Sequence, residues 1–200
     1  MNEMNNKGMD RRRFLKTLGM GVAATTISGC SSESDKKNDT SVSPEKMTGG
    51  MTYRKSLTGD NVSLLGYGCM RWPMIKDDNG KEVVDQETVN GLVDYAIEHG
   101  VNYFDTAPYY CNSNSEAALG HGVKAFREKV LLSSKFPTEV AKKPGDFRRQ
   151  LETTLKRLDT EYLDFYHFWG INKGSFDNII MKQDLLKDAQ LAKEEGMIRH

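Results

Sequence analysis

The chain has 200 residues, 38% of them hydrophobic, and its formal net charge at pH 7 is zero. This length suffices for a buried core in one or at most two domains, and the balanced charge does not suggest a nucleic-acid partner. The three cysteines, Cys30, Cys69 and Cys111, form no CxxC pair, so the sequence predicts neither a zinc site nor an iron–sulfur cluster within this chain. A disulfide between Cys69 and Cys111 in an oxidising compartment stays open at this stage.

Residues 1–29 have the features of an export signal. Residues 10–16, Asp-Arg-Arg-Arg-Phe-Leu-Lys, resemble the twin-arginine motif R-R-x-F-L-K, and an uncharged run follows in residues 17–29. This run is shorter than the about 20 apolar residues of a membrane-spanning helix. Residues 27–30, Ile-Ser-Gly-Cys, are similar to a bacterial lipoprotein cleavage box.

This resemblance implies export of a folded protein, cleavage before Cys30 and a lipid on that cysteine. The protein would then be anchored at the cell envelope, on the periplasmic side. A basic, disordered amino-terminal arm is the alternative. Residues 31–50 have almost no apolar side chain, so we expect residues 30–51 to form a flexible tether and residues 52–200 to fold.

Strand and helix patterns alternate four times in the folded part. We expect strands at residues 62–68, 101–104, 130–135 and 162–169, and helices at residues 85–99, 115–126, 146–158 and 184–195. Ser115 and Glu116 are predicted to cap the second helix, and Ile198 to begin a fifth strand. The alternation predicts an α/β fold with a parallel sheet and crossover helices, either an eight-stranded barrel or an open doubly wound sheet.

The stretch around Asp105 carries the strongest functional signal. Asp105 stands where the second strand should end, and Tyr110 follows five residues later in the loop before the next helix. Parallel α/β folds build active sites from such strand ends and loops. The third strand ends similarly in Lys135.

At this point the chain resembles the aldo-keto reductases, whose pattern D-T-A-x-x-Y is followed by S-E. The matching residues are Asp105, Thr106, Ala107, Tyr110, Ser115 and Glu116, with Cys111 where the family usually has Gly. The family's first strand ends in G-x-G-T-M-R-x-P, and the similar residues here are Gly66, Gly68, Met70, Arg71 and Pro73, with Cys69 in place of Thr.

The resemblance selects a (β/α)8 barrel of the TIM type and implies that about the first half, four βα units, is present. A closed barrel needs about 250 residues. We therefore expect this sequence to be a fragment, or to pair with a second copy.

The same resemblance implies reduction of an aldehyde or ketone by hydride from a nicotinamide cofactor. Tyr110 would be the proton donor and Lys135 would lower the pKa of its phenol, while Asp105 would hold Lys135 in place. Gly68, Cys69 and Asp105 would lie beside the cofactor. Tyr109 competes with Tyr110 for the role of donor.

His167 is the fourth predicted catalytic residue. Relatives usually carry His at the position of Trp169, and His167 lies two residues earlier on the same face of the strand. His167 could orient the carbonyl from deeper in the site or be a core histidine. Trp169 could stack on a ligand or narrow the pocket.

The resemblance implies a nicotinamide cofactor, either NADP(H) or NAD(H), and leaves both open. An iron–sulfur cluster would require a carboxyl-terminal module such as some relatives have. Outside the cytoplasm, a tightly held cofactor or electrons from a redox partner would have to sustain the reduction of a small carbonyl substrate. The rival hypothesis is an exported, non-catalytic barrel fragment that binds a sugar or another ligand.

Overall fold

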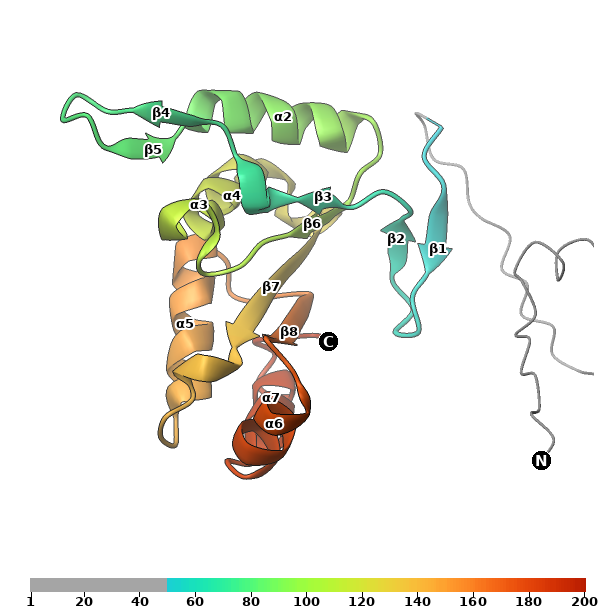
Figure 1. Ribbon diagram of the computed structural model, residues 1–200. Helices are drawn as coiled ribbons and strands as arrows, with labels where there is room; N and C mark the ends of the chain where they lie inside the picture. The colour runs from blue at the N-terminus through green and yellow to red at the C-terminus, as the bar shows by residue number, and fades with distance from the viewer. Residues whose placement is uncertain (1–49) are drawn as a thin grey trace, which may run out of the picture. The chain divides into compact units, whose positions relative to one another are not determined.

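The computed structural model describes residues 50–200 (Figure 1), so the predicted export signal, the predicted lipidation site Cys30 and nearly all of the predicted tether lie outside the described residues. Met51, the last residue of the predicted tether, packs partly buried against the core. Within residues 50–200, no helix has the length and the hydropathy that crossing a bilayer requires.

A four-stranded parallel sheet organises this part of the chain. Its order is β3 (Tyr67–Gly68), β6 (Tyr103–Asp105), β7 (Leu131–Pro137) and β8 (Phe165–Trp169). Within this sheet, each strand pairs in parallel with the strand of the same sheet that follows it in the sequence. Beyond β8, Ile198 bridges Leu163 in the parallel sense, which fits the predicted start of a fifth strand.

A helix follows each of the four strands, so the predicted α/β fold with alternating helices is confirmed. These helices are α2 (Gln86–Glu98), α4 (Ser115–Val123), α5 (Asp146–Leu158) and α7 (Leu185–Glu194). α4 packs between α2 and α5, and α5 also contacts α7 (Figure 1). Gly120 permits the close crossing of α4 over α5, because a Cβ there would lie 2.4 Å from the carbonyl oxygen of Leu158.

Short helical segments complete the loops. They are η1 (Cys69–Arg71), α3 (Tyr110–Ser113), η2 (Lys124–Lys129), η3 (Thr138–Val140), α6 (Lys173–Ser175) and the π-helical η4 (Phe176–Met181).

The prediction of one strand over residues 62–68 is wrong. Two hairpins flank the short β3, one formed by β1 (Tyr53–Lys55) with β2 (Asn61–Ser63) and one by β4 (Met74–Lys76) with β5 (Glu82–Val84). Between β2 and β3 the Ser63 hydroxyl donates to the carbonyl of Leu65. The chain turns there, and Leu64 and Leu65 are exposed despite their apolar character.

The two faces of the sheet differ in chemistry because side chains alternate along each strand. The outer face packs on α5, where Phe136 and Phe147 have ring centroids 5.0 Å apart and Phe147 and Tyr166 5.7 Å. The inner face carries Asp105 and Lys135. His167 also lies on that face and is exposed, so the inner face of β8 is open there.

Candidate active site

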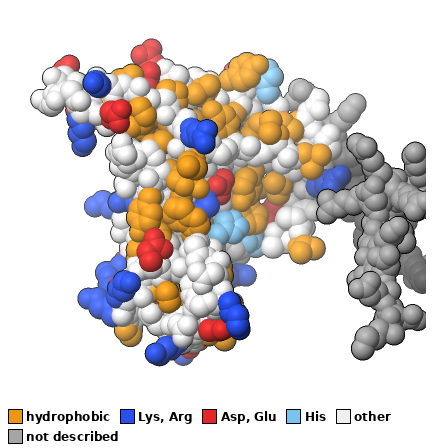
Figure 2. Space-filling view, viewed as in Figure 1, with side chains coloured by type: hydrophobic (Ala, Val, Ile, Leu, Met, Phe, Trp, Pro, Cys, Tyr) orange, Lys and Arg blue, Asp and Glu red, His pale blue; other side chains and the backbone are white. Residues whose placement is uncertain are grey.

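The carboxyl ends of β6 and β7 bring Asp105 and Lys135 together. Asp105 pairs in register with Gly68 on one side and Ser133 on the other, and Lys135 lies two residues further along β7, opposite His167. Residues two apart on a strand share a face, so these side chains all belong to the inner face. In the view of Figure 2, charged and histidine side chains lie beside hydrophobic ones near the middle of the molecule.

The ammonium of Lys135 lies at the centre of the site, between Asp105, Thr106 and Tyr110. Its Nζ donates to Asp105 Oδ2 at 2.6 Å and to the carbonyl oxygen of Thr106 at 2.7 Å. The side chains of Lys135 and Asp105 are only 14% and 32% exposed. An ammonium has three donors, so one remains for a third partner.

Tyr110 lies against this ammonium: Lys135 Nζ is 5.0 Å from the centroid of its ring. Tyr109 is 47% exposed, and its pKa is raised by desolvation and by the carboxylate of Glu139. A phenol that must give up a proton near neutral pH needs the opposite shift. Of the two tyrosines, Tyr110 is the one whose ring lies against the Lys135 ammonium.

The loop after Tyr110 has an unusual backbone. Cys111, Asn112 and Ser113 have φ values of 51°, 54° and 66°, in the left-handed region, which non-glycine residues rarely adopt. The side-chain amide of Asn114 donates to the carbonyls of Cys111 and Asn112, and stabilises the loop. A glycine at position 111 would adopt this backbone without steric cost.

Ser115 and Glu116 do not act as the predicted helix cap. The residue before α4 is Asn114, and it makes no side-chain capping bond. The hydroxyl of Ser115 instead donates to the carbonyl of Cys69 and lies 2.9 Å from the hydroxyl of Thr106. These contacts tie α4 to the ends of β3 and β6.

His167 and Trp169 both border the site. His167 Nε2 lies 3.5 Å from the hydroxyl of Tyr103. Although His167 keeps an exposed edge, desolvation by its neighbours lowers its pKa, and nearby Lys135 adds to that shift while Asp105 opposes it. Trp169 packs against Tyr109 and Tyr110, with ring centroids 5.8 Å and 5.9 Å apart.

The predicted cofactor-side residues have different surroundings. Gly68 is exposed, and a Cβ on it would meet no atom within 4 Å, so the surface beside Asp105 is open. Cys69 has no exposed surface, and burial raises the pKa of its thiol well above the usual value. Cys69 and Cys111 are both free thiols in the structure. A ligand on this surface would therefore contact Gly68 and Asp105 rather than the Cys69 side chain.

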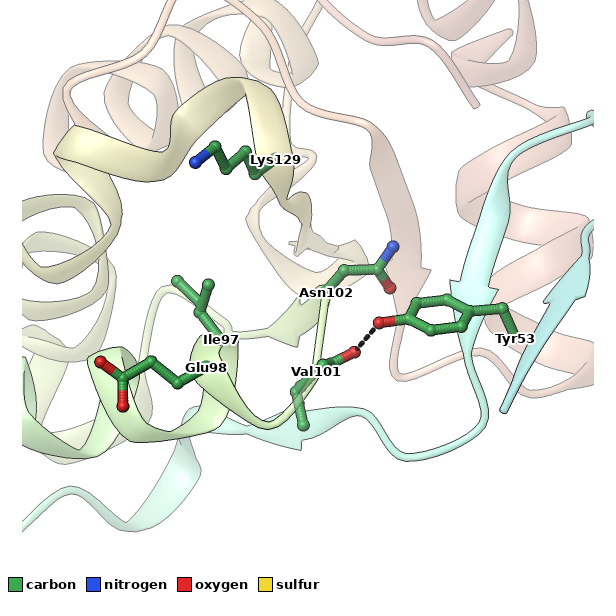
Figure 3. A pocket seen from close by; sticks show the side chains of 7 residues that line it. Tyr53, Ile97, Glu98, Val101, Asn102 and Lys129 are labelled. Atoms are coloured by element: carbon green, nitrogen blue, oxygen red, sulfur yellow. Dashed lines mark hydrogen bonds between the residues drawn. The ribbon is translucent and has the colours of Figure 1, made fainter. Parts of the chain in front are cut away.

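A hollow of about 380 Å³ lies elsewhere in the fold (Figure 3). Its lining includes Tyr53, Glu98, Asn102 and Lys129, at the amino-terminal end of β6. None of the predicted site residues contributes to it. Within residues 50–200, no group of three or more His, Cys, Asp or Glu side chains is placed to bind a metal ion.

Comparison with known proteins identifies the family. The model of the aldo/keto reductase family matches residues 64–200, which is more than half of the chain, so the protein belongs to this family. L-Galactose dehydrogenase from Arabidopsis thaliana is 31% identical over 155 residues, covering 71% of this chain and 44% of the relative. The chain spans less than half of the length of the curated relatives it matches.

Solved structures agree with this assignment. The thermostable aldo-keto reductase Tm1743, solved with the inhibitor epalrestat, is 32% identical with a TM-score of 0.59, covering 74% of this chain and 52% of that one. An aldo-keto reductase from Klebsiella pneumoniae in complex with NADPH is 25% identical with a TM-score of 0.58, covering 71% and 45%. The described fold is thus part of the barrel of this family.

Proposed function

We propose that this chain carries the proton-donating side of a carbonyl reductase that uses NADP(H). The placement of the Lys135 ammonium between the carboxylate of Asp105 and the ring of Tyr110 supports this proposal most directly. A positive charge beside a phenol stabilises phenolate, and a carboxylate holds the ammonium in place. Tyr110 would give its proton to the carbonyl oxygen of a small aldehyde or ketone.

The open surface at Gly68 and Asp105 fits a flat cofactor ring. Because nothing would obstruct even a Cβ at Gly68, a ring could lie against the backbone there. When bound, the reduced nicotinamide supplies the hydride for the carbonyl carbon. We favour NADP(H) over NAD(H) because the related Klebsiella pneumoniae protein is solved with NADPH.

His167 and Trp169 would shape the substrate side. The low pKa of His167 keeps the ring neutral near pH 7, so it could donate one hydrogen bond to a carbonyl oxygen without competing for the Tyr110 proton. Trp169 borders Tyr109 and Tyr110 and would limit the width of the substrate.

Nucleotide binding is the first test. Titration with NADPH should give a saturable change in the fluorescence of Trp169, which lies beside Tyr110. Gly68→Val would place a side chain on the open surface and should weaken binding about tenfold, a change of ~1.4 kcal/mol. Gly91→Ala is the matched control, because a Cβ at Gly91 on α2 also meets nothing within 4 Å.

The competing function is a binding module without catalysis. Trp169 at the usual position of a catalytic His favours it, because an indole can stack on a sugar but cannot transfer a proton. If neither NADPH nor NADH binds to the chain, the carbonyl-reductase proposal fails and this alternative takes its place.

We further propose that the protein is exported and anchored by a lipid on Cys30. The proposal is based on the order of the arginine motif, the uncharged run and the cysteine in residues 10–30. Cys30→Ala should move the protein from the membrane fraction to the soluble fraction, whereas Cys111→Ala should not. Export itself should be lost in the double variant Arg11→Lys, Arg12→Lys. Membrane attachment that persists in Cys30→Ala would contradict the lipid anchor.

A further inference from the structure

Ser133 is a fully buried polar residue between the two strands that carry the site, and no motif of the sequence points to it. It lies on β7, directly opposite Asp105 in the strand register. Its hydroxyl donates to Asp105 Oδ1 at 2.9 Å. Because a buried hydroxyl without a partner is costly, this bond accounts for the orientation of Ser133.

The two oxygens of Asp105 are therefore held by two residues of one strand. Oδ1 accepts from Ser133 and Oδ2 accepts from Lys135, and these donors lie two residues apart on the same face of β7. The terminal torsion of an aspartate is soft, so an ion pair alone would allow the carboxylate to rotate. The second bond fixes its plane, and with it the position of the Lys135 ammonium.

We propose that Ser133 is a positioning residue for carbonyl reduction: it fixes the carboxylate of Asp105 so that Lys135 stays against Tyr110. This inference rests on the function proposed above. Thr106 also holds the Lys135 ammonium, because its backbone carbonyl accepts a second hydrogen bond from Nζ.

The neighbouring Ser134 provides a matched control. It is also fully buried on β7, but its hydroxyl donates to Glu116 on the opposite, helix-covered face. Substitution of either serine by alanine removes one hydroxyl oxygen from β7. Of the two serines, only Ser133 donates a hydrogen bond to Asp105.

The first measurement needs no turnover. In the 15N-labelled chain at low temperature, the hydrogen bonds of the Lys135 ammonium should slow the exchange of its protons with water, and loss of the signal in Lys135→Met identifies it. Ser133→Ala should accelerate their exchange with water about fivefold or more, as expected when a bond in the network is lost. Ser133→Thr, which keeps a hydroxyl, and Ser134→Ala should leave the exchange near its wild-type rate. Wild-type exchange in Ser133→Ala overturns the proposal, even if the chain turns out to reduce no carbonyl.

The second measurement separates positioning from stability. With 4-nitrobenzaldehyde and NADPH, Ser133→Ala should lower kcat about tenfold, the usual effect of one hydrogen bond to a charged group, with little change in KM. Ser134→Ala should lower the melting temperature without this effect on kcat. A common loss of kcat in both variants would assign Ser133 a structural role only.

A variant that fails to fold would not block the comparison. If Ser133→Ala does not fold, Ser133→Cys keeps a side chain of similar shape with only a weak donor, and the same two measurements apply. Failure of wild-type turnover refutes the proposed function, whereas unchanged ammonium exchange refutes the role of Ser133, so the two outcomes are distinguishable.

Discussion

Lys135 is placed where a positive charge can act on a phenol, and two acceptors hold it there. Its ammonium is largely shielded from water, so its interactions are less screened than those of an exposed pair. Leaving Asp105 without this cation, or Lys135 without its carboxylate, would strand a partly buried charge. The ion pair therefore positions the ammonium as well as stabilising the strand ends.

His167 gives the site a predictable response to pH. Its pKa lies below the usual 6.5, chiefly because of desolvation. Below pH 6.5 the unfolded chain therefore binds more protons than the folded chain, and the free energy of unfolding decreases as the pH falls toward the folded-state pKa. His167→Gln should remove this part of the pH dependence.

Urea unfolding at pH 7.5 and pH 5.5 tests this expectation. The wild-type chain should lose more stability between the two values than His167→Gln does. His121→Gln, which replaces an exposed histidine of α4, controls for the loss of a histidine in general. Equal losses in wild type and His167→Gln would mean that the neighbours of His167 do not lower its pKa in the folded chain.

Asp105, Tyr110 and Lys135 could be selected from the sequence because each stands at a strand end or in the loop after it. The structure places the Lys135 ammonium 5.0 Å from the centroid of the Tyr110 ring; the catalytic roles of these residues remain a proposal. The left-handed backbone at Cys111, Asn112 and Ser113 could not be predicted, because none of these residues is glycine. Ser133 was missed because its role depends on the register of two strands distant in sequence.

At the scale of elements, a buried polar cluster joins α4, α5 and β7 on the outer face of the sheet. Glu116 has no exposed surface. Its Oε1 accepts from Ser134 at 2.7 Å and from Thr154 at 3.0 Å, and its Oε2 lies 3.2 Å from Nη1 of Arg157. Together with the bonds of neighbouring Ser115 to the β3 and β6 ends, this cluster locks α4 against the strands that carry the site.

Glu116→Ala should therefore destabilise the fold by ~2–3 kcal/mol, because it leaves buried hydroxyls without an acceptor. Glu128→Ala, which replaces an exposed glutamate of η2, should change the free energy of unfolding by less than about 0.5 kcal/mol. Chemical denaturation measures both. If Glu116→Ala lowers the free energy of unfolding as little as Glu128→Ala does, the cluster contributes little to stability.

The helices were better predicted than the strands. The range of α5, Asp146–Leu158, agrees with its amphipathic pattern, and Asp85 caps α2 by accepting from the backbone of Thr88. The prediction of one strand over residues 62–68 failed because the chain turns between β2 and β3. Most side chains of this range are apolar, but the range does not form one continuous strand. The apolar pattern does not locate the turn after Ser63. That turn depends on the bond from the Ser63 hydroxyl to the carbonyl of Leu65 and on the pairing of β2 with β1.

At the scale of the whole described fold, a second charged cluster secures the segment after α7. Asp164 is fully buried and pairs with Arg127 at 3.0 Å and Arg199 at 2.9 Å. The guanidinium carbons of these arginines lie 3.9 Å and 4.1 Å from the centroid of the Tyr162 ring. These contacts fix residues 198–200 beside β8, next to the parallel bridge between Leu163 and Ile198.

The central claim is that Tyr110, supported by Lys135 and Asp105, gives a proton to a carbonyl. The most direct test is the rate of NADPH-dependent reduction of 4-nitrobenzaldehyde by wild type, Tyr110→Phe and the matched variant Tyr109→Phe. Loss of a general acid should lower kcat at least about 100-fold in Tyr110→Phe, while Tyr109→Phe should stay within about threefold of wild type, as expected for a phenol outside the proton path. An inactive wild-type chain, or a Tyr110→Phe variant as fast as wild type, would contradict the account.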